Sequence, residues 1–384
     1  MNDIAELKEF VRVHARGQQI PDVERILDRI TDDGTGPGSW TGEWSAEART
    51  LEAAGRHLEA CRHHIMARFP YEDGPARKEA AEQAVAALDR WRSGSSGSDI
   101  HRFETDIDGH RVACWQTGLS PDHRRPLLVL MGGNVSVKEQ WAPALPVFRR
   151  LGMAAVVVDL PGIGENAVPY DADSWRFLSG LLDALSDQAD VRHTYALALS
   201  FSGHLALRCA MDDPRIRGVV TAGAPISAFF TDTDWQSRLP RITVAALTHL
   251  TGTGPEGLHD WALPAERLAR LDIPVAYVAS ARDEIIPAAD VELLRSHVRD
   301  LDVLVHDDVH ASPEHVTESK LWSARALLRM RGVRDLRSLA IGLMWRTARA
   351  RGRLPGGART IARSDSRPGS RSDARPDTRS GAAP

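Results

Sequence analysis

Residues 198–203 read Ala198-Leu199-Ser200-Phe201-Ser202-Gly203, and they stand between an apolar run at 195–199 and a helical pattern at 205–210. A serine on a sharp turn between a buried strand and a helix is typical of a nucleophile elbow. The residues two positions before and after such a serine are small because the strand and the helix pass close together there. Ala198 and Ser202 occupy the places where glycine is usual. We interpret Ser200 as the candidate nucleophile, with Ser202 as the alternative.

Short apolar runs alternate with helical patterns on both sides of this turn, between residues 100 and 331. Continuous apolar runs are typical of parallel strands that are buried on both faces and joined by helical crossovers. The pattern predicts an α/β-hydrolase fold, in which helices cover both faces of a mostly parallel sheet. The expected strands are 112–115, 127–131, 154–158, 195–199, 218–221, 275–278 and 303–305.

The composition changes along the chain and predicts its domains. Residues 1–92 carry apolar side chains at helical spacing, which predicts an N-terminal helical domain, called the helical cap domain below. The Ser- and Gly-rich stretch 93–99 is expected to be a linker to the hydrolase domain at 100–331. Residues 332–353 mix arginine with apolar residues and could form a basic amphipathic helix, whereas 354–384 have too few apolar residues to pack and are expected to be disordered.

The bulk composition excludes several classes of protein. With 42% hydrophobic and 26% charged residues and a formal net charge of -4, the 384-residue chain has the composition of a soluble globular protein and gives no reason to expect a nucleic-acid partner. The three cysteines are scattered, which predicts free thiols in a reducing cytoplasm and neither disulfides nor a metal site. The N-terminus does not read as a signal peptide, and no apolar run has the length of a membrane span.

Two further features concern partners and cofactors. The fragment Gly162-Ile163-Gly164 lacks the third glycine of a dinucleotide fingerprint, so no nicotinamide or flavin cofactor is expected. For the Arg-rich C-terminus, a solvated surface helix is favoured over contact with a membrane surface or another partner. The oligomeric state stays open, with a homodimer among the options.

An acid and a base follow two later strands of the expected sheet. Asp283 comes after the strand at 275–278, and His310 comes after the strand at 303–305. The order serine, acid, histidine at the ends of successive strands is that of a Ser-His-Asp triad on this fold. In such a triad the imidazole takes the serine proton, and the carboxylate orients the imidazole. The alternatives are Glu284 and Asp290 for the acid, and His306 and His315 for the base.

Two backbone amides are expected to form the oxyanion hole. The first is the N–H of Phe201, which follows the candidate nucleophile. The second comes from the loop after the strand at 127–131, where paired glycines allow amides to point inward. Asn134 is the preferred second donor, with Gly133 close behind.

The substrate pocket is expected to lie between the cap and the strand ends. Trp40 and Trp44 of the cap are candidates either for lining this chamber or for sealing the interface between the domains. Phe229 and Phe230 follow another strand and are candidate pocket walls, and Glu165 is a candidate polar contact.

Two motifs carry a resemblance to a known family. Residues 130–139, with the pattern Gly-Gly-x-x-Ser-x-Lys-Glu, and residues 158–165, with the pattern Asp-x-Pro-Gly-x-Gly-Glu, resemble signatures of the esterase FrsA-like α/β-hydrolases. This family includes 2,6-dihydroxypseudooxynicotine hydrolase and hydrolases that shorten polyketide chains. The resemblance runs from about residue 40 to residue 331. It implies a triad of Ser200, Asp283 and His310, an N-terminal domain that covers the active site, and hydrolysis of esters or of C–C bonds beside ketones without a cofactor.

The leading hypothesis is a cytoplasmic serine hydrolase that cleaves an ester, a thioester or a β-diketone-type C–C bond through an acyl-enzyme. Its expected partner is a small acyl or ketone molecule, for example a polyketide-like intermediate. Two alternatives stay open. One is an acyltransferase, cyclase or lyase of natural-product biosynthesis on the same fold, and the other is a binding protein that has lost catalysis.

Overall fold

The protein is described from a computed structural model that covers residues 2–94, 97 and 99–352. Its centre is an eight-stranded sheet in the order β1-β2-β4-β3-β5-β6-β7-β8. The first two strands of that order pair antiparallel, β2 and β4 are also antiparallel, and all later neighbours are parallel. The strands are β1 (His101–Ile107), β2 (His110–Thr117), β3 (Pro126–Met131), β4 (Ala154–Val158), β5 (Asp190–Ala198), β6 (Ile216–Ala222), β7 (Val275–Ser280) and β8 (Leu301–His306).

The apolar runs account for the centre of this sheet. All five residues of β4 and five of the six residues of β3 are buried, as expected for strands covered on both faces. Each of the seven expected strands corresponds to an observed one. The strand β1 was not expected, because its sequence is mostly polar and its residues are largely exposed or half-buried. It forms a hairpin with β2 at the edge of the sheet, where one face needs no apolar cover.

Helices pack on this sheet from the crossover connections. By their contacts, α6 lies on β2 and β4, α7 on β1 and β5, α8 on β5 and β6, and α14 on β6 and β7. This arrangement confirms the predicted α/β-hydrolase fold. The helices of this part are α6 (Leu145–Arg150), α7 (Arg176–Leu185), α8 (Phe201–Ala210), α9 (Ala228–Thr231), α10 (Thr233–Gln236), α11 (Arg241–Thr251), α12 (Ala265–Leu268), α13 (Ala288–His297), α14 (Val316–Met330) and α15 (Leu336–Gly352), with 3-10 turns η1 (Lys138–Gln140), η2 (Ala142–Ala144), η3 (Pro255–Trp261) and η4 (Pro313–His315).

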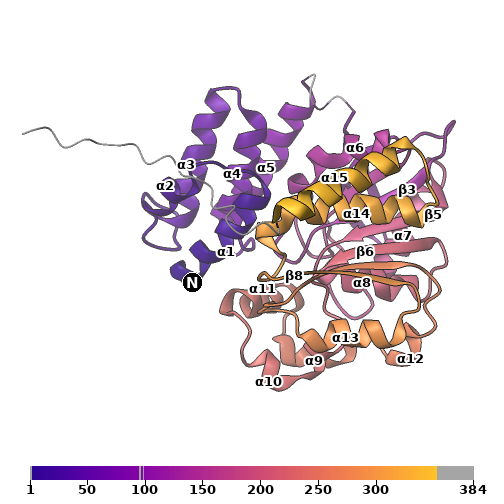
Figure 1. Ribbon diagram of the computed structural model, residues 1–384. Coiled ribbons are helices and arrows are strands. Elements are labelled where there is room, and N and C mark those ends of the chain that lie inside the picture. The colour runs from indigo at the N-terminus through magenta and orange to yellow at the C-terminus, as the bar shows by residue number, and fades with distance from the viewer. Residues whose placement is uncertain (1, 95–96, 98, 353–384) are drawn as a thin grey trace, which may run out of the picture.

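Five helices precede the sheet and gather beside one end of it (Figure 1). Asp3 caps the first helix by accepting the N–H groups of Ala5 and Glu6, and Ser39 caps the third by accepting that of Gly42. This layer contacts η1 after β3 and η4 after β8, so it meets the edge where the parallel strands end. The helices are α1 (Ile4–Gly17), α2 (Val23–Leu27), α3 (Trp40–Ala53), α4 (His57–Arg68) and α5 (Pro75–Arg92).

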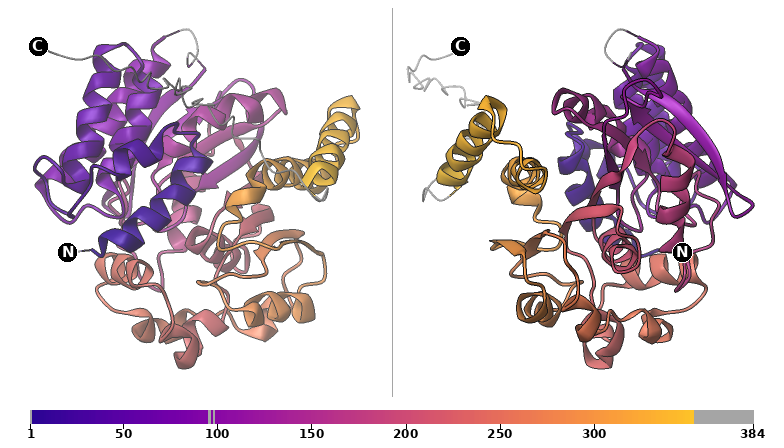
Figure 2. Two further views of the ribbon diagram at one scale, coloured as in Figure 1. Left: turned by 60° about the vertical axis from the view of Figure 1, so that its left-hand side comes forward. Right: turned by 90° about the vertical axis from the view of Figure 1, so that its right-hand side faces the viewer.

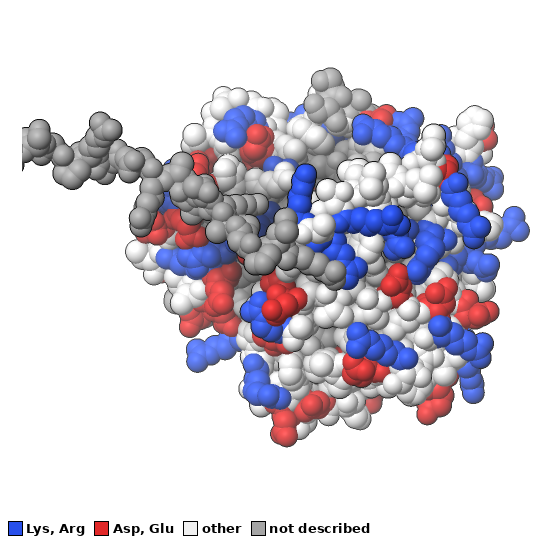
Figure 3. Space-filling view, viewed as in Figure 1, with Lys and Arg blue, Asp and Glu red and all other residues white. Residues whose placement is uncertain are grey.

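The helix expected near the C-terminus is present as α15, which packs on α14 as an outer layer (Figure 2). Trp345 faces the body of the protein, and the guanidinium groups of Arg325 and Arg349 each lie 5.2 Å from its ring. Leu336 and Leu339 are 83% and 68% exposed. Arginines accompany the exposed apolar side chains on this helix, and Figure 3 shows a band of basic residues across the same face of the molecule. The tail expected to be disordered lies outside the described residues.

Candidate active site

Ser200 occupies a strained turn between β5 and α8. Its backbone angles are φ 57° and ψ -127°, a conformation that L-residues adopt only when the surrounding structure enforces it. The turn is held by a hydrogen bond from the Ser200 N–H to the carbonyl of Ala222, at 2.8 Å. The Ser200 side chain is half-buried, and within the described chain its hydroxyl makes no side-chain hydrogen bond.

The small residues around the turn let α8 approach the sheet. A Cβ atom on Gly203 would lie 2.0 Å from Oγ1 of Thr221, so the close approach of helix and strand requires glycine at this position. Ser202, the alternative nucleophile, is fully buried and donates its hydroxyl to the carbonyls of Leu199 and Met131. Its hydroxyl is therefore engaged in holding the turn.

His310 and Asp283 form a hydrogen-bonded pair at the ends of β8 and β7. His310 Nδ1 lies 2.9 and 3.0 Å from the two carboxylate oxygens of Asp283. Oδ1 of Asp283 also accepts the N–H groups of Ile285 and Ile286, at 3.0 and 2.8 Å, which fixes the carboxylate. Burial disfavours the charged imidazole, but the charge and hydrogen bond of Asp283 outweigh it and raise the pKa of His310 above its ordinary value of 6.5.

Gly223 links this pair to Ser200. A Cβ atom on Gly223 would lie 2.6 Å from Cε1 of His310, so the imidazole packs directly on the backbone at this glycine. The residue before it, Ala222, accepts the N–H of Ser200. The imidazole and the nucleophile turn therefore lie against the same short segment at the end of β6.

The alternative acids hold the backbone of neighbouring loops. Glu284 accepts the backbone N–H of His310 at 3.0 Å and so helps to position the loop that carries the imidazole. Asp290 is fully buried and accepts four backbone N–H groups from residues 226–229, at 2.6–3.3 Å. Burial raises the pKa of Asp290, although the four N–H groups act in the opposite direction. These contacts give both carboxylates a positioning role.

The alternative histidines have other partners. His306 Nε2 lies 3.0 Å from the hydroxyl of Ser319, and burial lowers the pKa of His306 to about 4. His315 Nδ1 lies 3.0 Å from Asp308, which also accepts the N–H groups of Val309 and Glu314. Of the three histidines, His310 is the one that faces Asp283.

The loop after β3 lies against the nucleophile. A Cβ atom on Gly133 would be 3.1 Å from Cβ and 3.6 Å from Oγ of Ser200, so the backbone of this loop reaches the serine. Asn134 lies in a turn closed by a hydrogen bond from the Ser136 N–H to the Gly133 carbonyl. The N–H of Phe201 is the first of α8 and has no acceptor within the helix itself. The amides of the predicted oxyanion hole therefore belong to segments that meet at Ser200.

The helical layer braces this loop through a residue that the sequence did not indicate. Arg68, at the end of α4, is 2% exposed and donates from Nη1 to the carbonyl of Val135 at 2.8 Å. Its Nε lies 3.4 Å from Glu72. An arginine in a polar helix is usually a surface residue, so only the folded structure shows that this one reaches the loop beside Ser200.

A buried ion cluster lies beneath the same loop. Nζ of Lys138 lies 2.9 Å from Glu139, 3.1 Å from Asp159 and 2.8 Å from Glu165. Glu165 also pairs with Arg102 at 2.6 Å. Lys138 and Glu139 of the first sequence motif therefore lie together with Asp159 and Glu165 of the second. The Glu165 carboxylate, a candidate substrate contact, is directed to the two cations.

The pKa values of this cluster follow from burial and charge. Burial disfavours the charged ammonium, but the three carboxylates outweigh it and raise the pKa of Lys138. Burial raises the pKa of Asp159 to about 6, against the attraction of Lys138. Burial would also raise the pKa of Glu165, but Arg102 and Lys138 outweigh it and lower that pKa to about 2. Two cations share three carboxylates here, and Asp159 is easier to protonate than Glu165.

The aromatic side chains expected around the pocket are buried in packed layers. Trp40 and Trp44 are fully buried, and Nε1 of Trp40 donates to the carbonyl of Met66. Phe229 and Phe230 are at most 1% exposed, and both rings lie edge-on to Phe201. In this conformation all four side chains contribute to packing and have almost no surface for a substrate.

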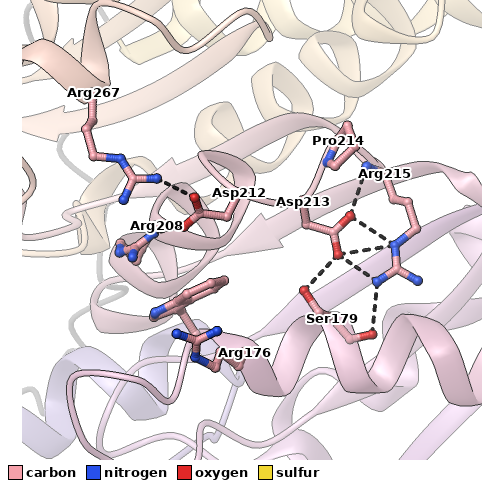
Figure 4. Close-up of a pocket in the computed structure, with 9 residues that line it drawn as sticks. Arg176, Ser179, Arg208, Asp212, Asp213, Pro214, Arg215 and Arg267 are labelled. Carbon is pink, nitrogen blue, oxygen red and sulfur yellow. Dashed lines mark hydrogen bonds and ion pairs between the residues drawn. The ribbon is translucent and has the colours of Figure 1, made fainter.

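A separate groove of about 720 Å³ lies beside α7 and the far end of α8 (Figure 4). Its arginines are paired with carboxylates: Asp212 binds Arg208 and Arg267, and Asp213 binds Arg215. The groove contains none of the site residues discussed above. Elsewhere, the described part of the chain holds no cluster of three or more His, Cys, Asp or Glu residues suited to a metal ion, and none of its helices combines the length and apolarity of a membrane span.

Comparison with known proteins identifies the family. The model of the esterase FrsA-like family matches residues 24–265, a range that contains Ser200 but neither Asp283 nor His310. Two solved structures, described as "AbyA5 Wildtype" and "AbyA5", are each 49% identical to this chain in sequence. The first has a TM-score of 0.87, and the match covers 90% of this chain and 99% of that chain. The second has a TM-score of 0.80, and the match covers 84% of this chain and 98% of that chain. The structure of a 2,6-dihydroxy-pseudo-oxynicotine hydrolase shares the fold at 19% identity and a TM-score of 0.60, with 75% of this chain and 86% of that chain covered. None of the curated proteins compared by sequence matches. The chain therefore belongs to the esterase FrsA-like family of α/β-hydrolases.

Proposed function

We propose that this hydrolase acts through a serine nucleophile, with Ser200, His310 and Asp283 as its triad. The observation that carries the proposal is the Asp283–His310 pair packed on Gly223, next to the segment that holds the strained Ser200 turn. Serine needs a base because its alkoxide is inaccessible near neutral pH, and an oriented imidazole supplies that base. In enzymes without bound substrate, the distance between the imidazole nitrogen of the base and the hydroxyl oxygen of the serine is often long, and it shortens when substrate binds.

The chemistry follows from these positions. Oγ of Ser200 attacks the substrate carbonyl while Nε2 of His310 takes the hydroxyl proton. The amides of Phe201 and of Gly133 or Asn134 hydrogen-bond the oxygen that becomes negative. The imidazolium then gives its proton to the leaving group, and an acyl group stays on Ser200. Water, activated by the same imidazole, cleaves the acyl-enzyme and restores the serine.

We propose a small acyl compound as the substrate, either an ester or thioester or a β-diketone that is cleaved at a C–C bond. For the first two, the leaving oxygen or sulfur takes the proton from His310. For a β-diketone the leaving group is an enolate, and the proton goes to carbon. No step of either route requires a cofactor.

The proposal is tested with p-nitrophenyl acetate and quenched-flow mass spectrometry. We expect an initial burst of p-nitrophenol and an acetyl group on the peptide that contains Ser200, followed by water-dependent turnover. Acetylation without turnover in water, relieved by an added alcohol or amine acceptor, would favour the acyltransferase alternative. A burst that persists in S200A would refute the assignment of the nucleophile. The matched control is S186A, at an exposed serine after α7, which should retain the burst.

A further inference from the structure

The first helix of the chain lies over the loop that carries His310. Helix α1 contacts η4 at residues 313–315, and Arg16 near its end forms an ion pair with Glu314. Helix α1 also contacts α11. This helix precedes residue 24, where the match to the family model begins, so its role must be argued from this chain itself.

One side chain of α1, His14, packs against the end of α4, the helix that contacts the loop beside Ser200. Its ring centroid is 5.0 Å from that of Phe69, which follows Arg68. Burial lowers the pKa of His14 to about 4, and positive charge on His310 and Arg68 lowers it further in the same direction. Arg68 is the residue that braces the loop beside Ser200, and His310 is the proposed base. By geometry, the ring of His14 packs on the residue next to the arginine that braces the loop beside Ser200, and its helix contacts the turn that follows His310.

The hydrogen-bonding capacity of this ring is unused. Unlike His204, which contacts the carbonyl of Trp261 at 2.8 Å, and unlike His306 and His315, His14 makes no side-chain hydrogen bond to any described residue. The residue as a whole is half-buried. A neutral imidazole offers one donor and one acceptor. An imidazole with this unused capacity, on a helix that contacts the turn after His310, is suited to bind a polar group of a substrate.

We propose that His14 contacts the substrate and hydrogen-bonds an oxygen atom near, but distinct from, the carbonyl attacked by Ser200. The ligand class is an acyl compound that carries a hydroxyl or keto oxygen close to the scissile bond, as opposed to a plain alkyl ester. This inference rests on the proposed function, since it assumes that Ser200 is the reacting residue.

The first test maps whether His14 and Ser200 share one space. The full-length enzyme is treated at pH 7 with diethyl pyrocarbonate, which modifies neutral imidazoles, with and without prior reaction with a bulky fluorophosphonate. We expect modification of His14 in the free enzyme and its loss once the adduct is on Ser200. His193, which is exposed and pairs with Asp190, should be modified equally in both samples. Equal modification of His14 in both samples would overturn the inference.

The second test measures selectivity. The kcat/KM ratio of p-nitrophenyl 3-hydroxybutyrate to p-nitrophenyl butyrate isolates the extra oxygen, because the two acyl chains have equal length. We expect H14F, which keeps a ring but loses the hydrogen bond, to lower this ratio about tenfold. H14N, which keeps a donor and an acceptor, should retain part of the preference. The matched control is E9Q, on the exposed face of the same helix; its ratio should equal that of the wild type.

The outcomes separate the two proposals. If the fluorophosphonate does not react with Ser200, the proposed function fails. If Ser200 reacts normally but H14F leaves the selectivity ratio unchanged, the inference about His14 fails and the proposed function stands.

Discussion

Replacing Lys138 by methionine should destabilise the fold strongly. Its ammonium is fully buried and lies 2.8–3.1 Å from three carboxylates, of which Glu139 and Asp159 are at most 2% exposed. Removing one partner of a buried ion pair typically costs about 3–5 kcal/mol, because it leaves an uncompensated charge in the interior. Without the Lys138 ammonium, three carboxylates share Arg102 as their remaining partner in the cluster. We therefore expect a loss of stability in the upper half of the range of about 3–5 kcal/mol.

The assay is urea unfolding of the full chain followed by tryptophan fluorescence. With a slope of about 3 kcal/mol per molar urea, suited to a large chain, the midpoint of K138M should fall by about 1–2 M. The control K78M removes an exposed lysine from α5 and should leave the midpoint within about 0.2 M, since surface substitutions usually change stability by less than about 0.5 kcal/mol.

The pH dependence identifies the cause. Without the ammonium, the pKa values of Asp159 and Glu165 in the folded state must rise above their values of about 6 and about 2 in the wild type. A carboxyl whose pKa is higher in the folded than in the unfolded state loses stability as pH rises through the interval between the two values. The loss in free energy of unfolding of K138M, relative to the wild type, should therefore be larger at pH 8 than at pH 5. The double variant K138M/D159N should be more stable than K138M alone at pH 8. A deficit below about 1 kcal/mol, or one independent of pH, would refute this reasoning.

Two further predictions concern the site itself. D283N should lower kcat by about 10⁴-fold, as expected when the imidazole loses the group that sets its tautomer. Because Asp283 raises the pKa of His310, the wild-type acylation rate should rise with pH through a pKa above 6.5. In D283N this pKa should be lower, as measured from the pH dependence of stopped-flow bursts. A wild-type profile that is flat between pH 5 and 8 would contradict a histidine base. D290N should lower the free energy of unfolding by about 1–3 kcal/mol in urea, because an amide cannot accept all four N–H groups of residues 226–229. An unchanged unfolding midpoint would show that the four hydrogen bonds contribute little.

The sheet was predictable from the sequence because parallel strands buried on both faces are continuous apolar runs. The runs at 127–131 and 154–158 correspond to β3 and β4 almost residue for residue. The edge strand β1 has no such run and escaped prediction, since one face of it needs no apolar cover. The same logic placed Ser200, Asp283 and His310 at strand ends, where a single sequence can indicate them.

The supporting contacts were not predictable, because they join residues that are far apart in the chain. The contact of Arg68 with Val135 spans 67 positions, and nothing in the local sequence distinguishes this arginine from a surface residue. The tryptophans at 40 and 44 were expected either to line the chamber or to seal the interface between the domains. The structure instead packs both in the interior of the helical layer, which local sequence cannot distinguish from a pocket wall.

The central claim, that Ser200 is a nucleophile activated by His310, is tested most directly by labelling with a fluorophosphonate. Intact-protein mass spectrometry should show one adduct per chain, and peptide mapping should locate it on Ser200. The adduct should be absent in S200A and should form at least 100-fold more slowly in H310A, within the range that general base catalysis contributes. An adduct on another residue, or one that forms at the wild-type rate in H310A, would contradict the account.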